Sequence, residues 1–201
     1  MLSNKLSTLL ATGHNESFIT DDGITLAALR DDVSKARESI KAVPNEEVAL
    51  FHSDAYIFLV WLLAAWQEKR KVLVPVDKSI ALSPRFSNWF KIGEFDEPNL
   101  AAWAENSKLP NRVFSELDPN FEALGVFTSG STGDPVRIDK TIRQLENEVE
   151  ALEFTFGEKI SKTVVFYRSV SHQRPGAGSI RWSATGCFRR SPRYRERATL
   201  G

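Results

Sequence analysis

The chain has 201 residues, of which 42% are hydrophobic and 26% are charged, and it contains one cysteine. This length suits one domain with its own core, at about 150 residues per domain, and the composition excludes collagen-like, disulfide-scaffold and fully disordered classes. The longest apolar run, residues 55–66, is shorter than the ~20 residues that cross a bilayer. The first residues show no signal-peptide pattern, so we expect a cytoplasmic protein with no membrane partner.

The net charge of zero divides unevenly along the chain. Residues 1–167 carry 18 Lys and Arg against 25 Asp and Glu, whereas residues 168–201 carry eight arginines against the single acid Glu196. All eleven lysines lie at or before Lys162. Such a switch within one chain is typical of a basic tail that binds an anionic partner.

The first 165 or so residues alternate between helix and strand patterns. Apolar residues recur at helical spacing from Asp21-Asp22-Gly23 to Pro44, with Asp21 or Asp22 as the expected N-cap. A buried strand is predicted next over 47–51, followed by a helix over 55–70 that Ser53 or Asp54 caps and a strand over 71–76. Residues 77–119 are expected to form short helices and loops. The last predicted elements are a strand over 120–127, an amphipathic helix from Asp139 or Thr141 to Phe156, and a strand over 163–167. Strand, helix and strand with tight joints predict a right-handed βαβ unit, and hence an α/β fold with a parallel sheet.

A loop rich in hydroxyls and glycines follows the strand that ends at Phe127, before the helix that we predict next. It reads TSGSTGDP and ends at Pro135. Glycines let a backbone approach an anion closely, and successive N–H groups and hydroxyls can donate hydrogen bonds to phosphate oxygens. It is not a Walker A loop, because Ser131 stands where the lysine should be after Gly125 and Gly130, and it is not a GxGxxG motif. A phosphate-binding loop and a polar turn between strand and helix both fit these residues.

TSGSTGDP preceded by a strand resembles the signature phosphate loop of the adenylate-forming (AMP-binding) superfamily, which includes acyl-CoA synthetases, peptide-synthetase adenylation domains and luciferases. The helix KTIRQLENEVEALEFTFG after the loop looks like that of bacterial acyl-CoA synthetase-type members, and VSHQ at 170–173 resembles the family's next motif. The resemblance implies that residues 1–173 are the N-terminal part of a doubly wound, parallel-sheet α/β enzyme domain.

The resemblance also implies what the loop does. It would hold the β- and γ-phosphates of ATP and the departing pyrophosphate, with Mg²⁺ sharing the charge, through Thr128, Ser129, Gly130, Ser131, Thr132 and Gly133. His172 would lie by the carboxylate substrate. Val136 replaces the family's lysine, and Arg137, one place later, is the candidate substitute. The implied function is that of an ATP-dependent acyl-adenylate-forming ligase. It would activate a fatty or aryl acid for coenzyme A or an acyl carrier protein.

The family's adenine-binding segment, ribose-binding aspartate, Mg²⁺-binding glutamate and catalytic lysine all lie well downstream of this loop, and none follows Gln173 here. We therefore assign no catalytic residue, and we expect a fragment that binds ATP weakly and is inactive alone. Residues 174–201 are rich in arginine, serine and glycine and have no periodicity. They fit a basic arm of a non-catalytic nucleotide- or nucleic-acid-binding protein, or a gene read out of frame. We favour the second interpretation and do not expect a nucleic-acid partner.

The remaining polar and aromatic residues favour structural roles. His52, between a strand and a helix, is expected to cap or to lie in the core. Glu46-Glu47 is expected to serve as a helix cap and surface charge, with no facing partner that would suggest paired acid–base chemistry. No His, Cys, Asp and Glu residues cluster at metal-ligand spacing. Four tryptophans are expected to serve packing, namely Trp61, Trp66, Trp89 and Trp103.

Overall fold

The computed structural model describes residues 5–17, 19, 23–76, 78, 88–103, 113–128 and 136–156. Its elements are α1 (Leu9–Thr12), α2 (Leu26–Lys41), β1 (Glu47–Phe51), α3 (Ala55–Gln67), β2 (Lys71–Val74), β3 (Phe90–Gly93), β4 (Glu122–Thr128), β5 (Val136–Thr141) and α4 (Ile142–Phe156). The strand predicted over 163–167 lies outside the described residues.

The strands form one five-stranded sheet in the order β3-β1-β2-β4-β5. β1 pairs in parallel with β2 and β3, and β2 pairs in parallel with β4, which confirms the predicted βαβ unit of β1, α3 and β2. β5 runs antiparallel to β4 and forms one edge of the sheet. The α/β prediction is therefore confirmed, and the sheet is mixed, with four parallel strands and one antiparallel edge strand.

Helices α2 and α3 begin where a side chain accepts hydrogen bonds from free N–H groups of the first turn. Asp54 accepts hydrogen bonds from the backbone N–H groups of Tyr56 and Ile57, as predicted for the cap of α3. The cap of α2 is Thr25, whose side chain accepts from the N–H of Ala28, so the prediction of Asp21 or Asp22 was wrong. A hydroxyl immediately before the apolar stripe provides the same acceptor closer to the first buried turn.

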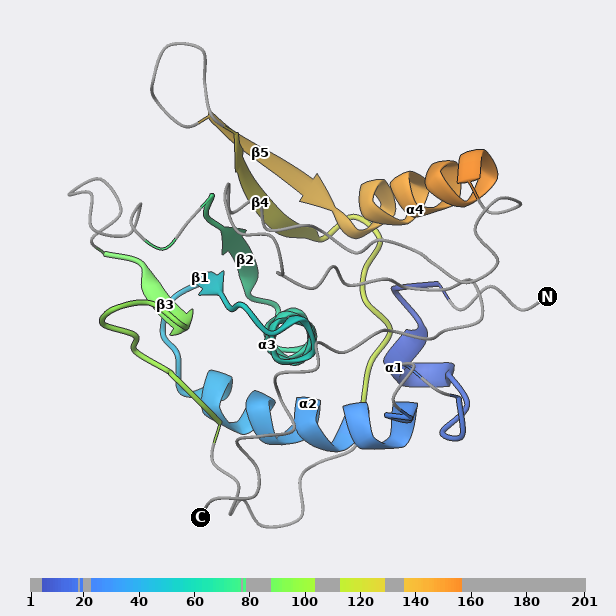
Figure 1. Cartoon of the computed structure of the whole chain (residues 1–201), viewed down its shortest axis with the longest axis horizontal. Coiled ribbons are helices and arrows are strands. Elements are labelled where there is room, and N and C mark those ends of the chain that lie inside the picture. Colours follow the sequence, from blue (N-terminus) through green and yellow to red (C-terminus); the bar gives the residue numbers. More distant parts are fainter. Residues whose placement is uncertain are drawn as a thin grey trace.

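α3 packs on one face of the sheet, and α2 packs on the side of α3 that faces away from the sheet (Figure 1). The core lies between these layers. α3 is buried nearly all round, including Trp61 and Trp66, which are 0% and 1% exposed. The indole N–H of Trp66 donates to the carbonyl of Ala123 at 2.7 Å and so joins the helix to β4. The packing roles predicted for these two tryptophans are confirmed.

Two strands were not predicted. β3 lies within the stretch expected to hold only short helices and loops. β5 occupies residues 136–138, for which no element was predicted, and the expected start of the following helix. α4 then begins at Ile142, and Thr141 caps it. The hydroxyl of Thr141 accepts from the N–H of Gln144 at 3.3 Å while the Gln144 side chain accepts from the N–H of Thr141 at 2.8 Å, which is a capping box.

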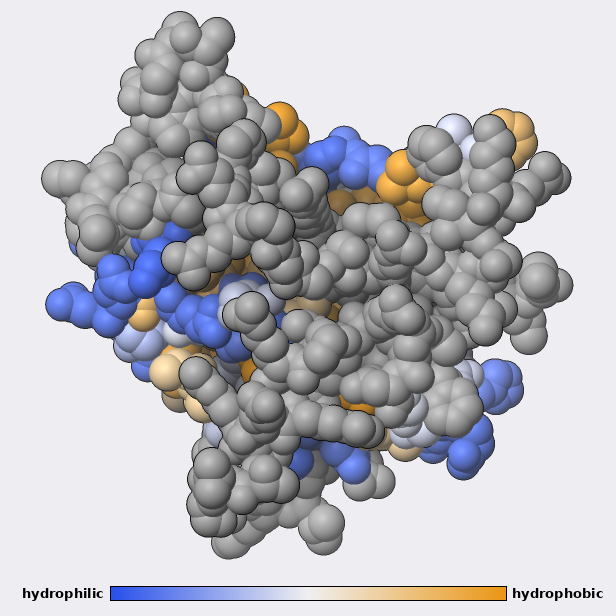
Figure 2. Space-filling view, viewed as in Figure 1, coloured by the Kyte–Doolittle hydropathy of each residue, from blue (hydrophilic) through white to orange (hydrophobic). Residues whose placement is uncertain are grey.

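Apolar surface remains exposed over β5 and α4, at the upper edge of the view in Figure 2. Ile142 and Leu145 in the first turns of α4 are buried, whereas Leu152 and Phe154 in its second half are exposed. Among the described side chains of the predicted amphipathic stripe, Ile142 and Leu145 are therefore buried in the core and Leu152 is exposed. In the described part of the chain, no helix is long and apolar enough to cross a membrane.

Candidate functional site

The hydroxyl-rich loop connects two antiparallel strands. β4 ends at Thr128, β5 begins at Val136, and these two residues are paired across the hairpin. The prediction that the loop lies between a strand and a helix was wrong, because β5 intervenes. The loop starts at the carboxyl end of a strand of the parallel sheet, where open α/β sheets bind their ligands.

Aromatic packing holds the end of β4 at the base of this loop. The rings of Phe127 and Trp89 lie 5.4 Å apart at 48°, and both contact a small cluster with Leu73 and Val76. Phe127 is only 7% exposed. The last described strand residues before the loop are thus anchored by packing on the face of the sheet opposite α3.

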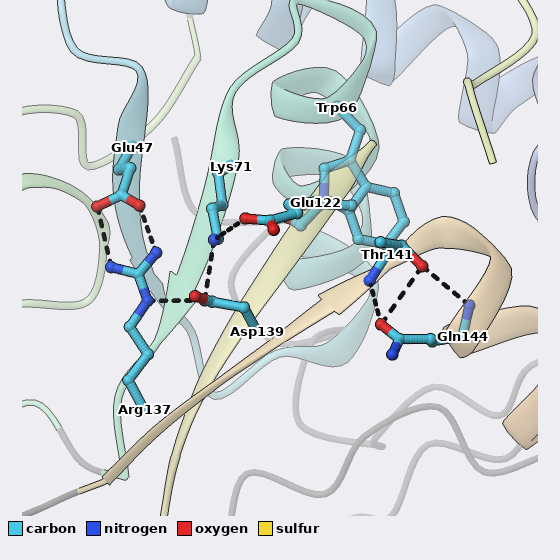
Figure 3. Close-up of polar contacts among 9 residues, drawn as sticks. Glu47, Trp66, Lys71, Glu122, Arg137, Asp139, Thr141 and Gln144 are labelled. Atoms are coloured by element: carbon cyan, nitrogen blue, oxygen red, sulfur yellow. Dashed lines mark hydrogen bonds and ion pairs between the residues drawn. The ribbon is translucent and has the colours of Figure 1, made fainter. Parts of the chain in front are cut away.

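Beyond the loop, Arg137 makes ion pairs instead of facing solvent freely (Figure 3). Its Nη1 donates to Glu47 Oε2 at 3.1 Å and its Nη2 donates to Glu47 Oε1, a bidentate pair. Its Nε donates to Asp139 Oδ1 at 2.7 Å. The hydrogen bonds that Arg137 donates to Glu47 raise the pKa of its guanidinium above the ordinary value, against the opposing effect of partial burial.

The carboxylate of Asp139 that accepts from Arg137 also pairs with Lys71. Lys71 Nζ lies 2.9 Å from Asp139 Oδ1 and 2.9 Å from Glu122 Oε2, and its side chain is only 11% exposed. Partial burial acts to raise the pKa of Asp139, but the hydrogen bonds and charges of Arg137 and Lys71 outweigh it and hold that pKa below its usual range. We call this alternating series the charge ladder, formed by Glu47, Arg137, Asp139, Lys71 and Glu122.

Gly125 makes the charge ladder possible. A Cβ at this position would lie 2.8 Å from Leu73 Cδ2, 3.0 Å from Asp139 Oδ1 and 3.2 Å from Arg137 Nε. Gly125 is paired with Leu73 on one side and Asp139 on the other. Gly125 therefore leaves a passage over β4, through which side chains of β5 reach β2 and β1.

The structure places only two of the predicted site residues. The backbone of Thr128 ends β4, and Arg137 belongs to the charge ladder. The other predicted site residues, Ser129, Gly130, Ser131, Thr132, Gly133 and His172, lie outside the described residues. The arginine-rich segment 174–201 also lies outside them, together with both interpretations of it.

The structure also tests the roles predicted for Glu47 and His52. The Glu47 side chain is 41% exposed, in keeping with the surface charge predicted for it, and it pairs with Arg137, a partner that the sequence did not indicate. His52 has the local role predicted: its Nδ1 accepts from the N–H of Asp54 at 2.9 Å, where β1 leads into α3. The missed signal for the charge ladder is the alternation Arg137-Ile138-Asp139, which places two opposite charges on one face of a strand.

The described residues offer no evident magnesium site. None of the described His, Cys, Asp and Glu residues gather in a group of three or more that could hold a metal ion. Glu47 and Asp139 are engaged by Arg137 and Lys71, so they are not arranged as free oxygen ligands. No step of the chemistry below therefore depends on a metal held by these side chains.

Comparison with known proteins supports the fold. No family model and no curated sequence matches the chain. Among solved structures, the amide bond synthetase McbA from Marinactinospora thermotolerans matches with a TM-score of 0.52 and 17% identity, over 73% of this chain and 36% of that one. McyG A-PCP, solved with phenylalanyl-adenylate, matches with a TM-score of 0.53 and 18% identity, over 76% of this chain and 30% of that one.

The matched enzymes are thus about three times as long as the part that this chain shares with them. The nonribosomal peptide synthetase FmoA3 gives a similar match, with a TM-score of 0.52 and 12% identity over 70% of this chain and 17% of that one. The resemblance indicated by the TSGSTGDP loop is confirmed at the level of the fold. The described part of the chain has a mixed, mostly parallel α/β fold that matches the N-terminal part of adenylation domains.

Proposed function

We propose that this chain forms the N-terminal, phosphate-binding part of an ATP-dependent acyl-adenylate-forming ligase. One observation carries the proposal. The TSGSTG motif begins at the carboxyl end of parallel strand β4, in a sheet with the fold of adenylation domains. The alternative is a polar hairpin turn without a ligand. It explains the glycines and hydroxyls, but it does not explain why this motif occurs in a sheet with the fold of adenylation domains.

In this proposal the loop binds the phosphates of ATP. Backbone N–H groups at Gly130 and Gly133, together with the hydroxyls of Thr128, Ser129, Ser131 and Thr132, donate hydrogen bonds to the β- and γ-phosphate oxygens. Such donors stabilise charge on the departing pyrophosphate while a carboxylate attacks the α-phosphate. Mg²⁺ bound to ATP supplies further charge neutralisation. His172 lies by the carboxylate of the acid.

The acid, the acceptor and the rest of the reaction belong to the proposal for the whole enzyme. McyG has been solved with phenylalanyl-adenylate, which supports a carboxylic acid substrate activated as its adenylate. Coenzyme A or a carrier protein is the acceptor we propose. Because the chain spans about a third of McbA and McyG, we propose that its 201 residues alone bind ATP without turning it over.

ATP binding by the 201-residue chain tests the proposal directly. We expect saturable binding of ATP in a calorimetric titration, weakened about tenfold by Thr132→Val, which removes one donor to a charged oxygen. The matched control is Thr155→Val, because Thr155 is exposed on α4 and its hydroxyl donates to the carbonyl of Ala151. Absence of ATP binding by the folded chain, or equal loss in both variants, would refute the phosphate-loop assignment. A measurable ATP–pyrophosphate exchange rate would refute only the claim that the chain is inactive alone.

A further inference from the structure

The hairpin that carries the loop is supported unequally on its two sides. β4 lies within the sheet, paired with β2 and β5, and Phe127 at its end is packed against Trp89. β5 is an edge strand whose described strand pairing is with β4 alone. Its first residue, Val136, is 54% exposed. Apolar packing therefore contributes less on the returning side of the hairpin than it does at Phe127.

Arg137, the second residue after the loop, anchors this side of the hairpin through its side chain. Its guanidinium is engaged with two carboxylates through three hydrogen bonds, of which two form a bidentate pair with Glu47 on β1. In the sheet order, β2 and β4 separate β1 from β5. The side chain thus joins the edge strand to β1, past β4 and β2, across the passage left by Gly125.

The rest of the charge ladder fixes this tie in place. Asp139 accepts from both Arg137 and Lys71, and the Lys71 side chain is mostly buried at the start of β2. Figure 3 shows the Arg137 guanidinium between Glu47 and Asp139, with the Lys71 ammonium between Asp139 and Glu122. An arginine held by a bidentate carboxylate has its donors set in one plane and direction. It cannot also turn to a phosphate without breaking that pair.

We infer that Arg137 is a positioning residue, which sets the returning side of the phosphate loop through the bidentate pair with Glu47 across Gly125, and that it does not bind phosphate itself. This inference rests on the proposed function, because it assigns how that loop acquires its ATP affinity. Val136 stands where the motif has a lysine. The neighbouring Arg137 does not replace that lysine as a phosphate ligand, because Glu47 and Asp139 hold its guanidinium on the sheet.

A double-mutant cycle on ATP affinity separates positioning from direct contact. We expect Glu47→Gln and Arg137→Met each to weaken ATP binding by the 201-residue chain about tenfold. We expect the double variant to be no weaker than either single one, since both changes remove one shared interaction. If Arg137 touched phosphate, Glu47→Gln would leave ATP affinity unchanged or raise it. That result would overturn the inference.

The conservative variant Arg137→Lys keeps the experiment informative if the methionine variant folds poorly. It retains the positive charge and loses the planar fork that Glu47 grips. We expect ATP affinity to fall as in Glu47→Gln, whereas a direct charge contact would largely survive. Near-normal ATP affinity in Arg137→Lys, with wild-type thermal stability, would overturn the inference.

Two controls separate the possible failures. Glu38→Gln breaks the exposed ion pair between Glu38 and Lys41 on α2, away from the sheet, and should leave ATP affinity unchanged. The melting temperature of each variant, measured without ATP, shows whether a loss of affinity is a loss of folding. If the wild-type chain binds no ATP, the proposed function fails. If it binds ATP and Glu47→Gln binds equally well, only the positioning role fails.

Discussion

The two faces of the sheet are built from different chemistry. The face toward α3 is apolar and closely packed, with Val48, Leu50, Val72 and Val74 all at most 1% exposed. The opposite face combines two small apolar clusters with the charge ladder at the amino ends of β1 and β2. The first face needs only volume and hydrophobicity, whereas the second depends on individual atoms meeting at set distances. We therefore expect mutations on the first face to cost stability, and mutations on the second to change how the loop is held.

Truncating Trp66 should have the largest effect. Trp66→Ala removes a side chain that is 1% exposed and its hydrogen bond to Ala123. We expect a loss of about 3–5 kcal/mol in the free energy of unfolding, measured by urea denaturation. The comparison variant is Leu152→Ala on the open half of α4, where Leu152 is 43% exposed and the change should stay within about 0.5 kcal/mol. Similar losses in the two variants would contradict the burial argument.

Filling the passage on the opposite face should come next. Gly125→Ala adds a Cβ that would lie 2.8 Å from Leu73 and 3.0 Å from Asp139. Because the buried Leu73 side chain and the charge ladder must both shift, we expect a loss of about 1–3 kcal/mol in urea denaturation. The loss of stability caused by Gly125→Ala should be smaller in an Arg137→Met background, because the guanidinium that the new Cβ would displace is absent there. A full, additive cost in that background would show that Gly125 does not serve the ladder.

Removing the N-cap of α3, the helix on the apolar face of the sheet, should lower stability less than the two changes above. Asp54→Ala leaves the N–H groups of Tyr56 and Ile57 without their acceptor, and we expect a loss of about 1 kcal/mol in thermal or urea unfolding. Asp54→Ser retains a capping oxygen and should recover most of this stability. Equal stability of the alanine and wild-type chains would mean that water caps the helix equally well.

The charge ladder predicts the smallest effect, which depends on pH. The pKa of Asp139 is lowered in the fold, so its ion pairs contribute stability above its unfolded pKa of about 3.9, and that contribution is lost as pH falls through the folded value. Because Asp139 is 37% exposed, we expect only about 0.5 kcal/mol. The stability difference between wild type and Asp139→Asn should narrow as pH falls from 6 to 3. A gap that widens toward low pH would contradict the assigned sign.

Much of the fold could be predicted from local sequence. Strand 47–51 and the α3 segment were recognised because an apolar run and an adjacent capping aspartate point to the same structure. β3 was not, since FKIG is only four residues long and carries a lysine. The capping box at Thr141 and Gln144 marks the start of α4, and it also implies that the preceding residues are not helical, which is where β5 lies.

The candidate site divides in the same way. The phosphate-loop motif is a contiguous pattern, so the sequence alone determined it and the fold class that goes with it. The charge ladder joins Glu47 to Arg137, which are 90 residues apart, and depends on the absence of a side chain at Gly125. Only the tertiary structure decided that partnership, because strand order and register, not proximity in the chain, bring those groups within hydrogen-bond distance.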